Sequence, residues 1–192
     1  MDKIRAMDWD SLLTAAQSGA EWSWDRIYGE LAPKVRGYLV SRGSVDPDDL
    51  LGEVWLQVAR NVGSFTGDEA GFRSWVFMIA HHRVVDERRR QSRRPVVRAE
   101  DGLGEDWAGV SESAEEGALV EEETREVLSM LAPLTDEQRE VLALRVIGDL
   151  TVNQVAEILG KRPGAVKALQ RRALRALRKR LERAYPYEPS IR

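Results

Sequence analysis

Arginines gather in the second half of the segment 72–94, which reads FRSWVFMIAHHRVVDERRRQSRR. The acidic residues in that stretch are only Asp86 and Glu87. A segment that is apolar at one end and strongly cationic at the other suits a polyanion as its ligand. An ordinary solvated helix end, stabilised by the helix dipole, would carry the same residues. The cationic side chains of the polar end are Arg83, Arg88, Arg89, Arg90, Arg93 and Arg94.

A second pattern that could do chemistry is the pair His82 and Asp86, which lie four residues apart and so share a helix face. Such a pair occurs in catalytic and in metal sites. The chain, however, has two histidines in all, no cysteine and no glycine-rich phosphate loop. The sequence therefore predicts that the protein is not an enzyme and has no catalytic residue, no metal site and no cofactor.

The apolar spacing of the first half of the chain predicts the helices that position these arginines and His82. Phe72, Trp75 and Val76 recur with Ile79 at helical spacing, which predicts an amphipathic helix from residue 72. Pro95 ends it, because a residue before proline is pushed out of the helical region. Apolar spacing predicts three earlier helices and then a glycine-rich loop. These helices are expected over 10–19, 21–42 and 46 to about 61, with the loop over 61–71.

The second half of the chain has clear helix starts. Thr135 with Gln138, and Thr151 with Gln154, form two capping boxes, each followed by apolar residues at helical spacing. Pro163 opens a further helix that runs to about residue 184. The segment 161–183 has ten basic residues and one acidic residue. A short turn between two helices, the second of them basic, is typical of a helix-turn-helix, although a three-helix bundle with a basic tail would also fit.

Charge divides the chain of 192 residues into three blocks. Residues 1–94 are neutral, 95–130 carry a net charge of −9, and 131–192 carry +6. With 43% hydrophobic residues, the two outer blocks can each form a core. No apolar run is long enough to cross a bilayer and the start lacks a signal-peptide pattern, so we expect a cytoplasmic protein without membrane insertion.

Four segments, in their order and separation, resemble the bacterial ECF (extracytoplasmic function, group IV) sigma factors, the small promoter-recognition subunits of RNA polymerase. They are GAEWSWDRIYGELAPKVRGYL, DPDDLLGEVWLQVARNVGSF, FRSWVFMIAHHRVVDERRR and LTDEQREVLALRVIGDLTVNQVAEILGKRPGAVKALQRRALRAL. The resemblance implies an all-α fold with two helical domains joined by an acidic flexible linker. The expected units are a sigma2-like bundle over 1–94, the linker over 95–125, a sigma4-like helix-turn-helix domain over 126–186 and a tail over 187–192.

The resemblance also implies a docking surface for core RNA polymerase on the helix that begins at Asp46. Asp49 and Glu53 match the family's acidic docking positions, and Asp48 precedes them. Being four residues apart, Asp49 and Glu53 share a face and could meet arginines of the partner. Asp49 also suits the positive end of the helix dipole. The family usually has glutamine where this chain has Gly52, which destabilises a helix.

In the family, the loop over 61–71 and the following helix melt the −10 element and hold an unpaired base, which a pocket of aromatic and polar groups can do. Phe65 matches an aromatic position there, although it could equally be a loop residue packed on the core. His82 stands where the family commonly has asparagine, so its hydrogen-bonding pattern to a base differs. The further expected −10 contacts are Arg83, Arg89 and Arg90.

In the second domain, the resemblance implies that the last helix reads the −35 element. Arg162 stands where the family often has serine, and Ala168 with Leu169 replaces a common Ser-Arg pair. The expected −35 contacts are Arg162, Lys167, Arg171 and Arg172. The apolar residues Val166, Leu169 and Leu174 are expected to pack against Val155 and Ile158. The basic residues further along this helix are expected to lie outside the major groove of the DNA, where they contact phosphates or solvent. They are Arg175, Arg178, Lys179 and Arg180.

The partners implied by the resemblance are core RNA polymerase, promoter DNA and an anti-sigma factor that masks both domains. The acidic linker resembles the family's connector, which threads toward the RNA exit path. The alternative is a stand-alone helix-turn-helix regulator that does not bind core polymerase. It would explain residues 135–184 but not 46–94, and such regulators usually need dimer symmetry.

Overall fold

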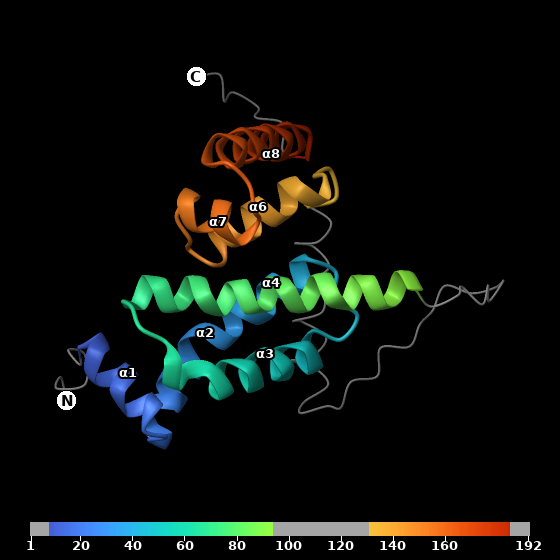
Figure 1. Ribbon diagram of the computed structural model, residues 1–192. Helices are drawn as coiled ribbons and strands as arrows, with labels where there is room; N and C mark the ends of the chain where they lie inside the picture. Colours follow the sequence, from blue (N-terminus) through green and yellow to red (C-terminus); the bar gives the residue numbers. More distant parts are fainter. Residues whose placement is uncertain (1–7, 94–130, 185–192) are drawn as a thin grey trace, which may run out of the picture.

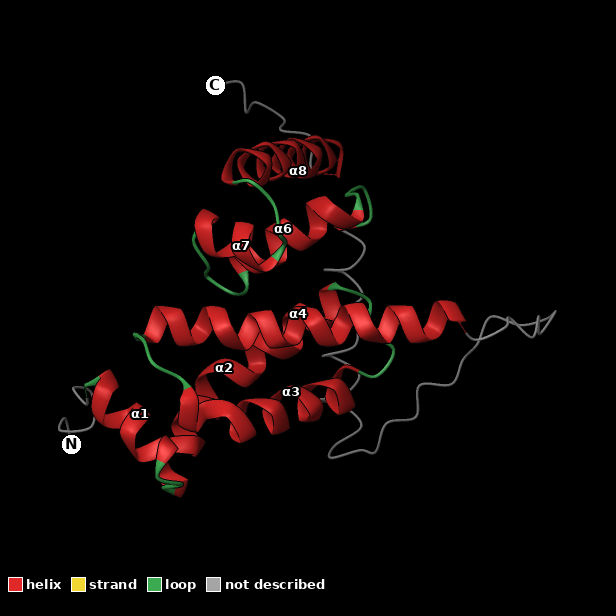
Figure 2. Cartoon of the chain, viewed as in Figure 1, coloured by secondary structure: helices red, strands yellow, loops and turns green. Residues whose placement is uncertain are grey.

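The computed structural model describes residues 8–93 and 131–184, and in both ranges the regular structure is helical, without strands (Figure 2). This confirms the expected all-α class. The predicted linker over 95–125 and tail over 187–192 lie outside the described residues. The elements are α1 (Trp9–Gln17), α2 (Glu21–Ser41), α3 (Pro47–Asn61), the short 3-10 helix η1 (Val62–Ser64), α4 (Glu69–Arg93), α6 (Asp136–Val146), α7 (Val152–Ile158) and α8 (Pro163–Ala184).

The helices are stacked in layers on either side of α4 (Figure 1). On one side α2 and α3 pack against α4, with α1 against α2. On the other side α6 and α7 lie over α2 and α4, and α8 packs on α6 and α7. We call α1–α4 the first domain and α6–α8 the second domain. No helix in these two described domains is both long and apolar enough to span a membrane.

Local sequence signals place most helix ends. Asp46 Oδ1 accepts the Asp49 N–H at 2.9 Å, as expected of an N-cap residue. Both predicted capping boxes form, at Thr135 and at Thr151. Gly160 has a φ of +59, the left-handed conformation that the sharp turn before α8 requires.

The helix expected from residue 72 begins earlier, at Glu69. Asp68 causes the difference, because its Oδ1 accepts the Gly71 N–H at 2.7 Å and so caps the helix. The predicted loop is correspondingly shorter than 61–71. Phe72, Val76 and Ile79 are buried as their spacing predicts.

In the second domain, Val166 and Leu169 of α8 are buried, as are Val155 and Ile158 of α7. The expectation that Leu174 packs there is wrong, since 51% of this residue is exposed. Ala173 is buried instead. It lies four residues after Leu169 and seven after Val166, so it continues their helical face, whereas Leu174 is rotated about 100° away from Ala173.

Candidate functional site

The outer face of α3 carries the residues expected to dock on a partner. Asp48 forms a two-point contact with Arg36, whose Nε and Nη2 lie 2.7 and 2.9 Å from its two carboxylate oxygens. This hydrogen bonding lowers the pKa of Asp48 below its ordinary value. Asp49 is exposed, and Glu53 is half-buried with its carboxylate 3.3 Å from Arg83. Of the three carboxylates, Asp49 is the one with no arginine partner in the described part of the chain.

Two further residues complete this face, and the sequence reading did not include them in the docking set. Leu56 is 58% exposed, which is unusual for a large apolar side chain. A Cβ added at Gly52 would meet no atom within 4 Å, so the helix backbone is bare there. Both share the face of Asp49, at three and seven residues along the helix. This helical spacing is the sequence signal by which Gly52 and Leu56 could have been assigned to the docking face.

A hollow opens where α3, η1 and α4 meet. Its sides combine aromatic rings with amide and hydroxyl groups. Phe65 stacks on Trp75 with ring centroids 5.3 Å apart and an interplanar angle of 30°. Phe65 also packs edge-on against the buried ring of Phe72, at 5.2 Å. Phe65 thus packs on the core and also lines the hollow, so the expected packing is present, and a role at the −10 element stays a prediction. The lining residues are Gln57, Asn61, Ser64, Phe65, Thr66, Trp75 and Ile79.

The loop that presents Phe65 is held by α1. Gln17 Nε2 donates to the backbone carbonyl of Val62 at 3.0 Å and to that of Phe65 at 2.9 Å. Trp9 Nε1 donates to the carbonyl of Gly67 at 2.9 Å. Both donors come from one helix, so the backbone on each side of Phe65 is fixed in place.

The other residues expected at the −10 element lie further along α4. His82 is exposed and does not line the hollow, although it shares the helix face of Trp75 and Ile79. Arg83 is directed to α3, where it pairs with Glu53 and donates to Gln57 Oε1 at 2.5 Å. In the described ranges, no group of three or more His, Cys, Asp or Glu side chains could hold a metal ion.

The cationic end of α4 is only partly available to a ligand. Arg89 and Arg90 are exposed, and Arg89 lies 3.5 Å from Asp86. Arg88 instead contacts the second domain through Asp136, at 3.2 Å. The described partner of the Asp86 carboxylate is thus an arginine of the same helix.

The basic helix α8 presents a shallow groove on its outer face. The groove contains Lys167 and Arg171 of the expected set, whereas Arg162 and Arg172 lie outside it. Arg172 Nε donates to the carbonyl of Ala168 in its own helix, at 3.3 Å. Gln170 and Leu174 lie in the groove and were not included in the sequence-based set. Its lining residues are Lys167, Gln170, Arg171, Leu174, Arg175 and Arg178.

Comparisons with known proteins show the family to which the chain belongs. Residues 27–94 match the sigma-70 region 2 family, and residues 130–179 match sigma-70 region 4. The chain is 32% identical to the ECF RNA polymerase sigma factor SigK of Mycolicibacterium vanbaalenii, over 88% of this chain and 87% of that protein. It is 34% identical to the ECF sigma factor ShbA of Streptomyces griseus, over 68% and 69% of the two chains. This chain belongs to the ECF RNA polymerase sigma factors.

A third relative of this sigma factor is BldN of Streptomyces coelicolor, an ECF RNA polymerase sigma factor that is 31% identical over 92% of this chain and 66% of BldN. The fold is also similar to that of CnrH, solved in complex with the cytosolic domain of CnrY. That likeness has a TM-score of 0.62, 19% identity, and coverage of 91% of this chain and 97% of CnrH. The sigma factor RpoE from Bartonella quintana gives a TM-score of 0.58 at 19% identity, over 82% and 98% of the chains.

Family membership decides between the readings of the sequence. A stand-alone helix-turn-helix regulator would not carry region 2, so that alternative is wrong. Sigma factors are transcription initiation factors and not enzymes, which agrees with the expectation for this chain. From here on, the first domain (α1–α4) is called the region 2 domain and the second (α6–α8) the region 4 domain.

Proposed function

We propose that this sigma factor binds core RNA polymerase through the outer face of α3, holds an unpaired base of the −10 element at the Phe65 hollow, and reads the −35 element with the groove of α8. The observation that carries the proposal is the hollow itself. It joins an aromatic surface to amide and hydroxyl groups on a braced loop, which is what an unstacked base requires. The cytoplasm, where the polymerase acts, is the proposed location.

The α3 surface suits a partner that presents basic groups around an apolar contact. Asp49 and Glu53 supply negative charge on one face of the helix, with Leu56 beside them. Glu53 is partly neutralised by Arg83, so we assign the larger electrostatic role to Asp49. Asp48 is bound to Arg36, and we infer that it positions this helix relative to α2 as well as facing the partner.

At the −10 element, we assign stacking on a base to Phe65 and hydrogen bonding to the polar side chains of the hollow. His82 lies beyond the hollow on the same face of α4, where it can contact the next nucleotide. Arg89 and Arg90 are exposed and suit phosphate contacts. Arg83 acts mainly on Glu53 and Gln57 in this proposal.

On α8, we assign base contacts to Lys167, Gln170 and Arg171. Lysine and arginine pair with guanine edges, and glutamine pairs with adenine. Arg162 precedes the first residue of α8, and Arg172 lies in α8 outside the groove; both suit phosphate contacts.

An anti-sigma factor is the further partner that we propose. It would hold this protein inactive by masking its two domains. CnrH was solved with the cytosolic domain of CnrY, and RpoE from Bartonella quintana with the anti-sigma factor NepR. Co-purification of the tagged chain from its own cells, followed by transcription assays with and without each co-purified protein, would test this. A full set of co-purified proteins that leaves transcription unchanged would count against it.

The −10 assignment can be tested by replacing Phe65 with leucine, which keeps apolar bulk and removes the aromatic face. Stacking of a base on an aromatic ring contributes about 1–3 kcal/mol. Phe65→Leu should therefore slow promoter opening about 5- to 150-fold, seen with 2-aminopurine in the −10 element, and leave closed-complex affinity unchanged. The control is Phe72→Leu, the same change at a buried ring that does not line the hollow. Equal opening rates for the two variants would refute the assignment.

A further inference from the structure

The loop that carries Phe65 is held from outside the hollow, by the two ends of α1. Gln17 is the last residue of this helix, and its side-chain amide donates to two carbonyls, that of Val62 at 3.0 Å and that of Phe65 at 2.9 Å. Trp9 is the first residue of the helix, and its indole N–H donates to the carbonyl of Gly67 at 2.9 Å. One helix therefore binds the backbone of the loop at three points between residues 62 and 67.

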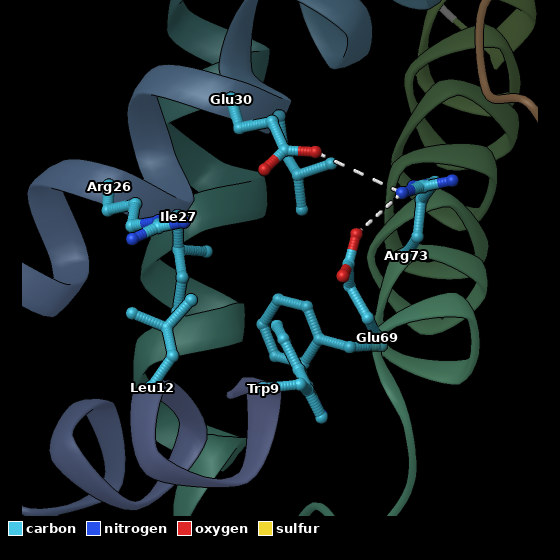
Figure 3. A pocket seen from close by; sticks show the side chains of 9 residues that line it. Trp9, Leu12, Arg26, Ile27, Glu30, Glu69 and Arg73 are labelled. Carbon is cyan, nitrogen blue, oxygen red and sulfur yellow. Dashed lines mark hydrogen bonds and ion pairs between the residues drawn. The ribbon is translucent and has the colours of Figure 1, made fainter. Parts of the chain in front are cut away.

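Trp9 is fixed by its own packing, so its N–H has a defined position. The centroid of its ring lies 5.2 Å from that of Phe72, at an interplanar angle of 53°. The same side chain lines a cavity between α1, α2 and α4, together with Leu12 and Ile27 (Figure 3). Both of these aliphatic residues are buried. The indole is thus anchored on the core of the region 2 domain and holds the loop through its polar edge.

The ring of Phe65 lies against the same piece of backbone that Trp9 binds. A Cβ added at Gly67 would lie 3.2 Å from Phe65 Cζ, and a Cβ added at Gly71 would lie 3.9 Å from the same atom. Gly67 has a φ of +149, a conformation that other residues rarely adopt. Any shift of Gly67 moves the surface on which the Phe65 ring rests. The hydrogen bond from Trp9 therefore helps to set the position of this ring.

Neither donor belongs to the hollow itself. Gln17 and Trp9 are not among the residues that line it, which come from α3, α4 and the segment between them. Gln17 is also exposed, so replacing it should change the stability of the fold only slightly. A substitution at either position leaves every side chain of the hollow unchanged and alters only how firmly the loop is held.

We propose that Gln17 and Trp9 are positioning residues for promoter opening, which hold the Phe65 ring where an unpaired base stacks on it. A binding surface whose supporting groups fix it in advance captures its ligand more readily than one that must first be ordered. The proposal rests on the proposed role of Phe65 at the −10 element. It gives α1 a function in opening, whereas the first binding of duplex DNA does not depend on it.

Trp9→Phe separates the hydrogen bond from the packing, because phenylalanine keeps an aromatic ring against Phe72 and has no N–H donor. Loss of one hydrogen bond should slow opening about 2- to 10-fold. The measurement is the rate of 2-aminopurine fluorescence change in the −10 element, with holoenzyme assembled from core polymerase and each full-length variant. Closed-complex affinity should stay unchanged.

The matched control is Trp24→Phe. The indole N–H of Trp24 also donates to a backbone carbonyl, that of Ala16 at 3.2 Å, but this bond joins α2 to α1 and does not reach the loop. Trp24→Phe should therefore open the promoter at the wild-type rate. Equal rates for Trp9→Phe and Trp24→Phe would overturn the role of Trp9.

Gln17 can be tested by removing its donor and then restoring one. Gln17→Met has a similar length and no N–H group, so it should slow opening about 3- to 30-fold through the loss of two hydrogen bonds. Gln17→Lys supplies a donor again and should recover most of the rate. Thr14→Lys places the same charge one turn earlier on an exposed part of α1 and should leave the rate unchanged. A Gln17→Lys variant as slow as Gln17→Met would show that the donor is not what matters.

A double-mutant cycle with Phe65→Leu shows whether the effect passes through this ring. Gln17→Met should slow opening by a smaller factor in the Phe65→Leu background than in the wild type. Equal factors in the two backgrounds would overturn the positioning role. If Phe65→Leu alone opens the promoter at the wild-type rate, the proposed function of the hollow is refuted, and this inference with it. If Phe65→Leu is slow while Gln17→Met and Trp9→Phe are as fast as the wild type, only the positioning role is refuted.

Discussion

The guanidinium group of Arg83 lies 3.3 Å from the carboxylate of Glu53, so a residue expected to face DNA is paired with one expected to face the polymerase. Both side chains are partly exposed, at 28% and 33%, and such a pair contributes about 0.2–1 kcal/mol. The pair connects the two proposed surfaces of α3 and α4, and the first prediction follows from it.

Glu53→Gln should weaken binding to core polymerase less than Asp49→Asn, because Arg83 already offsets the charge of Glu53. In an Arg83→Met background the loss caused by Glu53→Gln should grow, by up to about fivefold in Kd. Fluorescence anisotropy of labelled sigma factor titrated with core polymerase gives these affinities. Identical losses in the two backgrounds would show that the pair does not modulate docking.

A substitution at Gly52 should have opposite effects on the stability of the protein and on its binding to core polymerase. Gly52→Gln should stabilise the protein by about 0.5–1 kcal/mol, because glycine inside an exposed helix is unfavourable and the added side chain meets open space. If the partner approaches the bare backbone, the same change should weaken polymerase binding.

The matched control is Gly29→Gln on α2, where an added Cβ also meets nothing within 4 Å. It should stabilise the protein similarly and leave polymerase affinity unchanged. Chemical denaturation and polymerase titration together decide the outcome. Tighter polymerase binding by Gly52→Gln would mean that the glycine is a weakness of this surface and not an opening for a partner.

Glu140 should make stability depend on pH. Its burial alone would raise the pKa of its carboxyl, but hydrogen bonding with His81 and the charges of Arg42 and Arg88 outweigh burial and hold the pKa below 4.5. A lowered folded-state pKa contributes stability above the ordinary value, and this contribution is lost as the pH falls through the folded-state pKa. Glu140→Gln should therefore cost about 3 kcal/mol at pH 7, because it leaves Arg42 buried without its carboxylate.

The difference in unfolding free energy between wild type and Glu140→Gln should shrink as the pH falls below the ordinary pKa of a glutamate, because the carboxyl is then protonated in the unfolded chain before it is protonated in the folded one. Denaturation curves at several pH values from 7 to 3 measure it. The exposed Glu157 on α7 provides the control, since Glu157→Gln should change stability by less than about 0.5 kcal/mol. A difference that stays constant with pH would contradict the prediction.

Alanine replacements inside and outside the groove of α8 should have different effects on DNA binding. Lys167→Ala, Gln170→Ala and Arg171→Ala should relax base preference in the −35 element, each by about 1–3 kcal/mol. Lys179 is exposed and lies outside the groove, so Lys179→Ala should weaken binding to all sequences and reduce the salt dependence. Binding to a panel of −35 mutants at several salt concentrations distinguishes these effects. If Lys167→Ala and Arg171→Ala lose affinity equally for every DNA of the panel, these side chains do not read bases and α8 binds DNA only through its positive charge.

The ends of helices can be predicted from the sequence where a nearby side chain caps the backbone. Asp46, Thr135 and Thr151 each cap a helix through a side chain near its own backbone, so their role needs no tertiary information. Asp68 is the same kind of signal, and overlooking it placed the start of α4 three residues late. Leu174 shows that one residue of error in helical phase moves a side chain from the core to the surface.

The contact between the domains could not be predicted in the same way. Periodicity shows which face of a helix is buried but not what covers it. Arg42 follows the end of α2 and has the sequence features of an exposed helix terminus, yet it is only 3% exposed because the region 4 domain covers it. Arg88 likewise belongs to a cluster that suggested a polyanion, whereas a carboxylate from 48 residues away is its partner.

The bracing of the Phe65 loop by Trp9 and Gln17 has a consequence for where a minimal domain can be cut. The match to region 2 begins at residue 27, so α1 lies outside it. A fragment trimmed to that boundary would lose the side-chain hydrogen bonds to the carbonyls of Val62, Phe65 and Gly67. Its loop would keep the packing of Phe65 on Phe72 and Trp75 but lose the anchoring of its backbone, so more of the entropic cost of ordering the loop would fall on DNA binding. The segment that matches region 2 and the unit that holds the loop in place therefore begin at different residues.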